Sequence, residues 1–278
     1  MSQKSYNNSA TLYLIPTPIG NMEDMTYRAV KILNEVEIVL SEDTRVTGIL
    51  LKHYNIKKRL IANHEHNEIK NKEMVINLLE DGKSIGLVSD RGTPVISDPG
   101  FEIAKYAIEK GYNVVALPGA TALIPALICS GLNPMPFTFY GFLNSKESKR
   151  KTELETLKNI KNTIIFYEAP HRITKTLENV LDILGNRKMC VAREISKKFE
   201  EIYRGTVKEV IEETKDIKGE IVFLIEGNNE VNDFNDITIN EQINMFIEEG
   251  FSQMEAIKKV SKLRNIPKSE IYNKYHNK

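Results

Sequence analysis

The chain has 278 residues, 41% of them hydrophobic and 27% charged, and its formal net charge is zero. That length is typical of two α/β domains with an appendage, and it exceeds what one small domain needs. The longest apolar runs are the size of a strand, and the first ten residues are largely polar. These features argue against a membrane span and a signal peptide, so a cytoplasmic protein is expected.

In its first half the chain alternates short apolar runs with helical patterns. Strands are predicted at residues 11–16, 37–40, 84–88 and 113–117, and helices at 27–36, near 47–54 and from 101 to a stop at Gly111. This β-α-β-α order predicts a mainly parallel sheet with helices on its faces.

The second half opens on the polar segment 144–151, which is typical of a linker or an exposed loop. Strands are then predicted at 163–167, 188–193 and 220–225, helices at 173–184 and 207–213, a second linker at 228–235, and three short helices after it. The sequence thus predicts an α/β protein with an N-terminal α/β domain (11–142), a second α/β domain (152–228) and a basic C-terminal helical extension (237–278).

Clusters rich in Pro, Gly, Asp and Thr follow three of the predicted strands, at residues 16–21, 89–100 and 118–122. Turn chemistry explains any one of them. However, ligands bind at the carboxyl ends of parallel strands, where all three would meet in one cleft. The chain has no GxGxxG or GxxxxGK[ST] motif, and the prolines of the first cluster lack the N–H groups that cradle phosphate. A ligand with an apolar or neutral polar body is therefore expected.

Eight sequence blocks carry a resemblance to the tetrapyrrole-methylase superfamily. In chain order they are LYLIPTPIGNMEDMTYRA, SEDTRVT, LVSDRGTPVISDPG, ALPGATAL, FYGF, FYEAPHR, AREISKKFEE and GEIVFLIEG. More narrowly, they resemble the bacterial branch that methylates the ribose 2′-hydroxyl of a cytidine in the decoding region of 16S ribosomal RNA. Many superfamily members carry a GxGxGD loop where this chain has residues 16–21, and the RNA-directed branch resembles this chain there.

The resemblance implies two α/β domains that hold S-adenosylmethionine (SAM) in the cleft between them, and a homodimer. SAM would leave as S-adenosylhomocysteine, and no metal is required. The residues that the resemblance assigns to the SAM pocket, with much of the contact through the main chain, are Pro18, Ile19, Gly92, Thr93, Pro94, Ile96, Thr121, Ala122, Tyr167, Glu168, Ala169, Ala192 and Ile221.

A ribose hydroxyl is a weak acid, so methyl transfer to it can use a general base. The candidates are Asp43, Glu168, His171 and Glu194, and the sequence does not choose among them. Asp43 can instead cap a helix, His171 can be an exposed residue of a first helical turn, and Glu194 can belong to a solvated ion-pair face.

Two basic segments point to a polyanionic partner, expected to be 16S rRNA in the small ribosomal subunit. Residues 144–151 hold four Lys/Arg, and residues 251–278 hold seven Lys/Arg against two Asp/Glu. RNA contacts are predicted for Arg45, Lys146, Lys149, Arg150, Lys151, Arg172, Arg193, Lys197, Lys258, Lys259 and Lys262. The alternative for the tail is a helical bundle that packs on the core or the dimer interface and whose basic face does not bind RNA.

Two other functions stay open at this point. One is methylation of a tetrapyrrole-like acceptor on the same scaffold, which the basic segments and the 16–21 loop disfavour. The other is a non-catalytic ribosome-assembly factor, which the intact SAM loops disfavour. No metal site is expected, because Cys129 and Cys190 lack a CxxC partner, and His64 and His66 lack an accompanying carboxylate motif.

Overall fold

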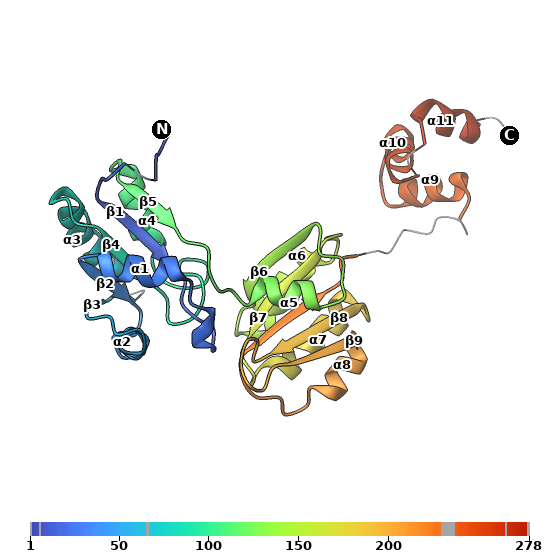
Figure 1. The fold of residues 1–278 in the computed structure, drawn as a ribbon. Coiled ribbons are helices and arrows are strands. Elements are labelled where there is room, and N and C mark those ends of the chain that lie inside the picture. The colour runs from blue at the N-terminus through green and yellow to red at the C-terminus, as the bar shows by residue number, and fades with distance from the viewer. Residues whose placement is uncertain (1, 6, 65–66, 229–236, 265, 277–278) are drawn as a thin grey trace. The chain divides into compact units, whose positions relative to one another are not determined.

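The computed structural model describes residues 2–5, 7–64, 67–228, 237–264 and 266–276, and the chain divides into two compact units, 1–228 and 229–278. The first unit contains two five-stranded sheets (Figure 1). None of the helices among the described residues is both long enough and apolar enough to cross a membrane.

The first sheet is parallel throughout, as the β-α-β-α order predicts, and its strand order is β3-β2-β4-β1-β5. Its strands are β1 (Thr11–Ile15), β2 (Ile38–Ser41), β3 (Arg59–Ala62), β4 (Ile85–Val88) and β5 (Asn113–Ala116). The connecting segments are the 3-10 helix Met22–Asp24 and the helices α1 (Tyr27–Glu35), α2 (Thr44–His53), α3 (Glu68–Glu80) and α4 (Phe101–Glu109). Two apolar clusters form the core: α1 and α2 contribute to one, and α3 and α4 contribute to the other.

The second sheet is mixed and has the order β6-β7-β10-β8-β9. Only β6 and β7 pair in parallel; β10 runs antiparallel to β7 and β8, and β8 antiparallel to β9. Its strands are β6 (Phe137–Phe142), β7 (Thr163–Glu168), β8 (Lys188–Arg193), β9 (Glu201–Thr206) and β10 (Ile221–Ile225). The expected N-terminal domain, 11–142, therefore ends on a strand that pairs in the second sheet.

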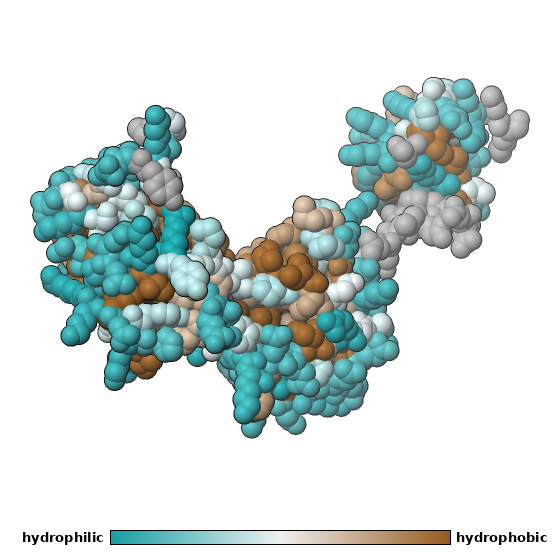
Figure 2. Space-filling model, in the orientation of Figure 1, coloured by the Kyte–Doolittle hydropathy of each residue, from teal (hydrophilic) through white to brown (hydrophobic). Residues whose placement is uncertain are grey.

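Helix α5 (Leu123–Cys129) packs on one face of the second sheet through Ala126 and Leu127, which are buried against Ile165 and Val222. Its outer face is apolar as well: Ile128 is 72% exposed, and Figure 2 shows hydrophobic residues gathered over this helix. This helix thus carries an uncovered apolar surface within the described part of the chain.

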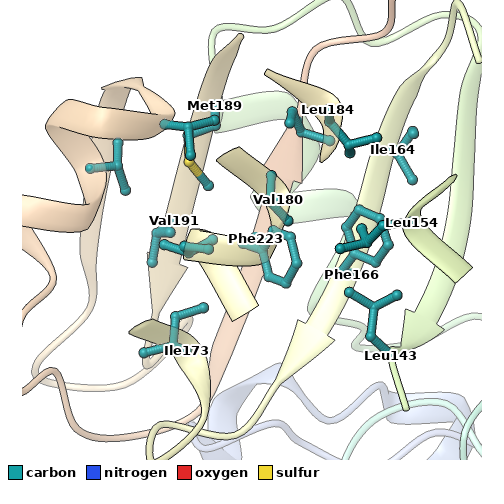
Figure 3. Packing of buried hydrophobic residues seen from close by; sticks show 14 of the residues in the cluster. Leu143, Leu154, Ile164, Phe166, Ile173, Val180, Leu184, Met189, Val191 and Phe223 are labelled. Atoms are coloured by element: carbon teal, nitrogen blue, oxygen red, sulfur yellow. The ribbon is translucent and has the colours of Figure 1, made fainter. Parts of the chain in front are cut away.

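The other face of the second sheet is covered by α6 (Glu147–Leu157), α7 (Ile173–Leu184) and α8 (Val207–Glu213). At the centre of this core the fully buried rings of Phe166 and Phe223 stack with centroids 4.6 Å apart (Figure 3). Helix α6 begins inside the polar segment 144–151, so the expectation of a linker or loop is wrong over most of that segment. These residues form a packed helix because the buried guanidinium of Arg150 donates a hydrogen bond of 2.9 Å to Asn179 on α7, which holds α6 against the core.

The second unit consists, in its described part, of three short helices, as the sequence predicts: α9 (Ile239–Glu248), α10 (Gln253–Arg264) and α11 (Lys268–His276). Their shared core is Ile243, Ala256, Ile257, Val260 and Ile271, all fully buried. A capping box formed by Thr238 and Glu241 begins α9. Apart from Asn228, the linker expected at 228–235 lies outside the described residues.

Candidate functional site

The first unit contains a cavity of about 420 Å³, which is within the usual size range of small-molecule and cofactor sites. The loops that follow β1, β4 and β5 contribute to it, as the convergence of the three polar clusters predicts. The remaining wall comes from the ends of β6 and β7, from the start of β10, and from the residues that follow β7 and β8 or precede β10. The lining residues are Ile19, Arg91, Gly92, Thr93, Ile96, Ser97, Asp98, Thr121, Ala122, Phe142, Tyr167, Glu168, Ala169, Pro170, Ile195, Glu220, Ile221 and Val222.

Hydrogen bonds join the three strand-end loops into one wall. The N–H of Thr17 donates to the carbonyl of Gly92 at 2.9 Å, and the N–H of Gly92 donates to the carbonyl of Thr17 at 3.0 Å. The Thr17 hydroxyl also donates to the carbonyl of Ser89, and the Thr93 hydroxyl donates to the carbonyl of Ala120, both at 3.1 Å. Both backbone polar groups of Gly92 are therefore engaged within the protein, so this residue contributes shape to the cavity.

The backbone at Gly92 disfavours a side chain, because its conformation is strained for other residues and the space around it is tight. Its φ is +81°, a region that L-residues other than glycine rarely adopt. A β-carbon built there would lie 3.2 Å from Cγ2 of Ile19 and 3.6 Å from the carbonyl oxygen of Ala120. Gly92 thus allows the first and third loops to approach the second one closely.

Aromatic side chains from the second sheet form the opposite wall. The Tyr167 hydroxyl hydrogen-bonds to Thr121 in the third loop, and burial raises the pKa of this phenol. The ring of Phe142, which is 55% exposed, meets the Tyr167 ring edge to face with centroids 5.6 Å apart. The cavity therefore has one half-exposed flat ring at its edge.

The residues assigned to the SAM pocket from the sequence lie around this cavity, with three exceptions: Pro18, Pro94 and Ala192 are not among its lining residues. Ala192 is fully buried in β8, where it pairs with Val222, so its side chain packs inside the sheet. The lining residues that were not predicted from the sequence are Arg91, Ser97, Asp98, Phe142, Pro170, Ile195, Glu220 and Val222.

Glu168 lines the cavity, but both of its carboxylate oxygens already accept hydrogen bonds. Oε1 accepts one from the N–H of Ala169 at 2.8 Å, and Oε2 accepts one from the hydroxyl of Thr176 at 2.7 Å. The guanidinium of Arg172 pairs with the same carboxylate at 3.1 Å, and the Glu168 side chain is fully buried. These contacts fix the turn between β7 and α7, so they give Glu168 a structural role in shaping the wall.

The other three candidates for a general base lie outside the cavity lining. Asp43 caps α2 and pairs with Arg45, and the hydrogen bond from the Arg45 side chain lowers its pKa to about 2, which makes it a weak base. His171 is exposed in the turn before α7. The Glu194 carboxylate accepts hydrogen bonds from Lys197 at 2.8 Å and from the N–H of Glu220 at 2.9 Å.

Asp98 is the acidic lining residue whose pKa is raised. Burial raises the pKa of its carboxyl to about 6, with further contributions from the negative charges of Glu42 and Asp90. None of the described residues donates a hydrogen bond to this carboxylate or forms an ion pair with it. The cavity wall thus presents one unengaged carboxylate with like-charged neighbours.

An ion-pair network borders the cavity beside Glu220. Arg91 from the second loop pairs with Glu220, and Lys197 pairs with both Glu220, at 3.0 Å, and Glu194. The methylenes of Lys197 also lie over Gly20 in the first loop, because a β-carbon built on Gly20 would clash with them. Lys197 is therefore held by structural contacts, in addition to its predicted role toward RNA.

The structure places the cations predicted to contact RNA in three kinds of environment. Arg150 is buried, and Arg172 is bound to Glu168, so neither presents a free guanidinium. Arg45, Lys151 and Arg193 take part in ion pairs at the surface. The members that are exposed on their helices or at a helix start are Lys146, Lys149, Lys258, Lys259 and Lys262.

Comparison with known sequences identifies the relatives of this chain. Residues 11–211 match the family described as Tetrapyrrole (Corrin/Porphyrin) Methylases. A protein of Bacillus subtilis (strain 168) named "Ribosomal RNA small subunit methyltransferase I" is 47% identical, and the match covers 99% of this chain and 97% of that protein. A protein of the same name from Halalkalibacterium halodurans is 43% identical over 99% of each chain.

Solved structures support the same fold. Uroporphyrin-III-C-methyltransferase from Thermus thermophilus superposes with a TM-score of 0.57 at 18% identity, covering 78% of this chain and 94% of that chain. The methyltransferase CobJ superposes with a TM-score of 0.59 at 17% identity, covering 79% of this chain and 95% of that chain. At such identities the likeness concerns the fold alone, whereas the sequence match is extensive. The chain belongs to the tetrapyrrole methylase family.

Proposed function

We propose that this protein transfers a methyl group from SAM to the 2′-hydroxyl of a cytidine ribose in the decoding region of 16S rRNA. The observation that carries the proposal is the full-length similarity, at 40–47% identity, to proteins named "Ribosomal RNA small subunit methyltransferase I". The choice of a cytidine 2′-hydroxyl comes from the resemblance of the sequence blocks to the RNA-directed branch.

The cavity fits SAM in size and chemistry. Its volume of about 420 Å³ is adequate for a cofactor of that size, and Ile19, Ile221 and Val222 supply apolar contacts for a flat, neutral ring. Gly92 keeps the wall clear of a side chain that would otherwise fill it.

When bound, SAM supplies a methyl carbon that its sulfonium already activates for displacement. The protein's task is then to hold the attacking oxygen in line with that carbon. Orientation of this kind contributes roughly 7–11 kcal/mol to lowering a barrier. Loops joined by hydrogen bonds, such as Thr17 to Gly92 and Thr93 to Ala120, provide a wall rigid enough for this purpose.

We expect wild-type protein to transfer labelled methyl from SAM to 30S subunits or to naked 16S rRNA, and not to a tetrapyrrole. Digestion of the product to nucleosides should yield ribose-methylated cytidine. Transfer to the tetrapyrrole alone would contradict the proposal, as would label on a base instead of a ribose. Calorimetry with SAM tests the remaining alternative, since a non-catalytic RNA-binding factor should show no saturable heat.

We also propose that the protein acts as a homodimer. The family resemblance implies it, and the uncovered apolar face of α5, with Ile124 and Ile128 exposed, offers a surface that a second copy can bury. Sedimentation equilibrium at micromolar concentration should give twice the mass of one chain, and Ile128→Lys should shift the protein toward monomer. A wild-type protein that sediments only as a monomer would refute this proposal.

A further inference from the structure

The loop that carries Asp98 is fixed at both ends. At its start, Gly92 is hydrogen-bonded to Thr17. At its end, the buried carboxylate of Glu68 accepts hydrogen bonds from the N–H groups of Gly100, at 3.0 Å, and Glu102, at 2.8 Å. A side chain on such a loop is held in a defined place relative to the cavity, as a group that acts on a bound substrate must be.

Backbone strain within this loop is a second sign that its shape serves the site. Val95 has a φ of +80°, which is a genuine outlier for a β-branched residue and costs on the order of 1–3 kcal/mol. The next residues, Ile96, Ser97 and Asp98, all line the cavity. The strained residue thus turns the chain so that three successive side chains line the same space.

Within the cavity, the Asp98 carboxylate is available for a substrate. None of the described residues donates a hydrogen bond to it or pairs with it, whereas both oxygens of Glu168 are engaged. The charged and titratable groups around Asp98 are Glu42, Asp90 and the phenol of Tyr167. Acidic neighbours and partial removal from water both destabilise the ionised form of a carboxyl group, so such a carboxylate accepts a proton more readily.

We propose that the Asp98 carboxylate accepts the proton of the ribose hydroxyl during methyl transfer. This proposal rests on the function proposed above. The ribose oxygen forms a bond to the methyl carbon as the sulfur–carbon bond breaks, and the electron pair of that bond stays on sulfur. The hydroxyl proton passes to Asp98 and then to water, so charge and atoms balance without any further reactant.

The pH dependence follows from the raised pKa of Asp98. The ionised carboxylate is the active form, so kcat/KM for SAM should rise as pH increases through about 6 and then level off. Glu42→Gln removes a negative neighbour, which lowers the pKa of Asp98 and should move this rise to lower pH. Because Glu42 does not line the cavity, its substitution should leave the plateau rate unchanged.

The decisive variant is Asp98→Asn, which keeps the shape of the side chain and removes the base. We expect methyl transfer to fall by about 10²–10⁴-fold, while the calorimetric Kd for SAM stays within twofold of wild type. That unchanged Kd also demonstrates a folded cavity. The inflection near pH 6 should disappear, and the residual rate should rise steadily with pH as hydroxide replaces the carboxylate.

Two results would overturn the assignment of Asp98. The first is an Asp98→Asn variant that transfers methyl at the wild-type rate. The second is a loss of SAM affinity that accounts for the whole loss of rate, since Asp98 would then hold the cofactor. If the wild-type protein does not methylate ribose at all, the proposed function itself fails, and this outcome is recognised before any variant is measured.

Discussion

Gly92→Val is expected to raise the Kd for SAM by at least about 100-fold, which corresponds to about 2.7 kcal/mol. The β-carbon alone would lie 3.2 Å from Cγ2 of Ile19, and the two methyl groups of valine must find further room in the same wall. The first and second loops would separate, because the paired backbones of Thr17 and Gly92 could not keep their present distance. Isothermal titration calorimetry measures the effect directly.

Gly111→Val is the matched control for this experiment. Gly111 has a φ of +84°, close to that of Gly92, yet a β-carbon there meets nothing within 4 Å, and the residue is not part of the cavity lining. Both variants carry a similar backbone strain, on the order of 1–3 kcal/mol, so both should lose thermal stability, and Gly92→Val should lose more because of its contact with Ile19. Only Gly92→Val should lose SAM binding. Unchanged SAM affinity in folded Gly92→Val would remove Gly92 from the cofactor site.

Local sequence patterns predict the elements whose apolar residues repeat with a clear period. Helix α7 and strand β8 have the bounds expected from the sequence, because α7 has a continuous apolar face that ends at Gly185 and β8 is an uninterrupted run of four buried residues. Strand β6 was not predicted: it lies at the edge of the second sheet, only Gly141 in it is buried, and its place depends on pairing with the distant strand β7. The antiparallel pairing of the second sheet likewise depends on contacts between distant segments.

One part of the candidate site could likewise be predicted from the sequence, and another part could not. The contribution of the three strand-end loops follows from the sequence, because Pro, Gly and Thr after a strand mark the edge where ligands bind, whereas the individual lining residues were assigned from the family resemblance. Asp98 lies in the second of these clusters, so its sequence position already pointed to the cavity. That its carboxylate has no hydrogen-bond or ion-pair partner among the described residues could be seen only in the structure. Phe142 lies at the end of β6, and its place beside the cavity could not be known before that strand was paired.

Charge reversal on α10, Lys258→Glu together with Lys262→Glu, is expected to weaken rRNA binding about 10- to 100-fold near physiological salt. Both side chains are exposed and lie four residues apart, on one face of the helix, whereas Ala256, Ile257 and Val260 form its buried side. Lys259 is left unchanged, because its ammonium lies 3.5 Å from the centroid of the Phe251 ring and 4.8 Å from that of Phe246. The variant should therefore keep its three-helix core.

The salt dependence of rRNA binding shows whether the basic face of α10 contacts RNA. If two phosphate contacts are lost, the slope of log K against log salt should become shallower by about 1.4 to 1.8. Lys105→Glu with Lys208→Glu makes the same change in net charge on α4 and α8, outside the basic segments, and should alter the slope much less. SAM affinity should match the wild type in both variants, since none of these lysines lines the cavity. Wild-type rRNA binding by the α10 variant across the salt series would show that this basic face has no part in recruiting RNA.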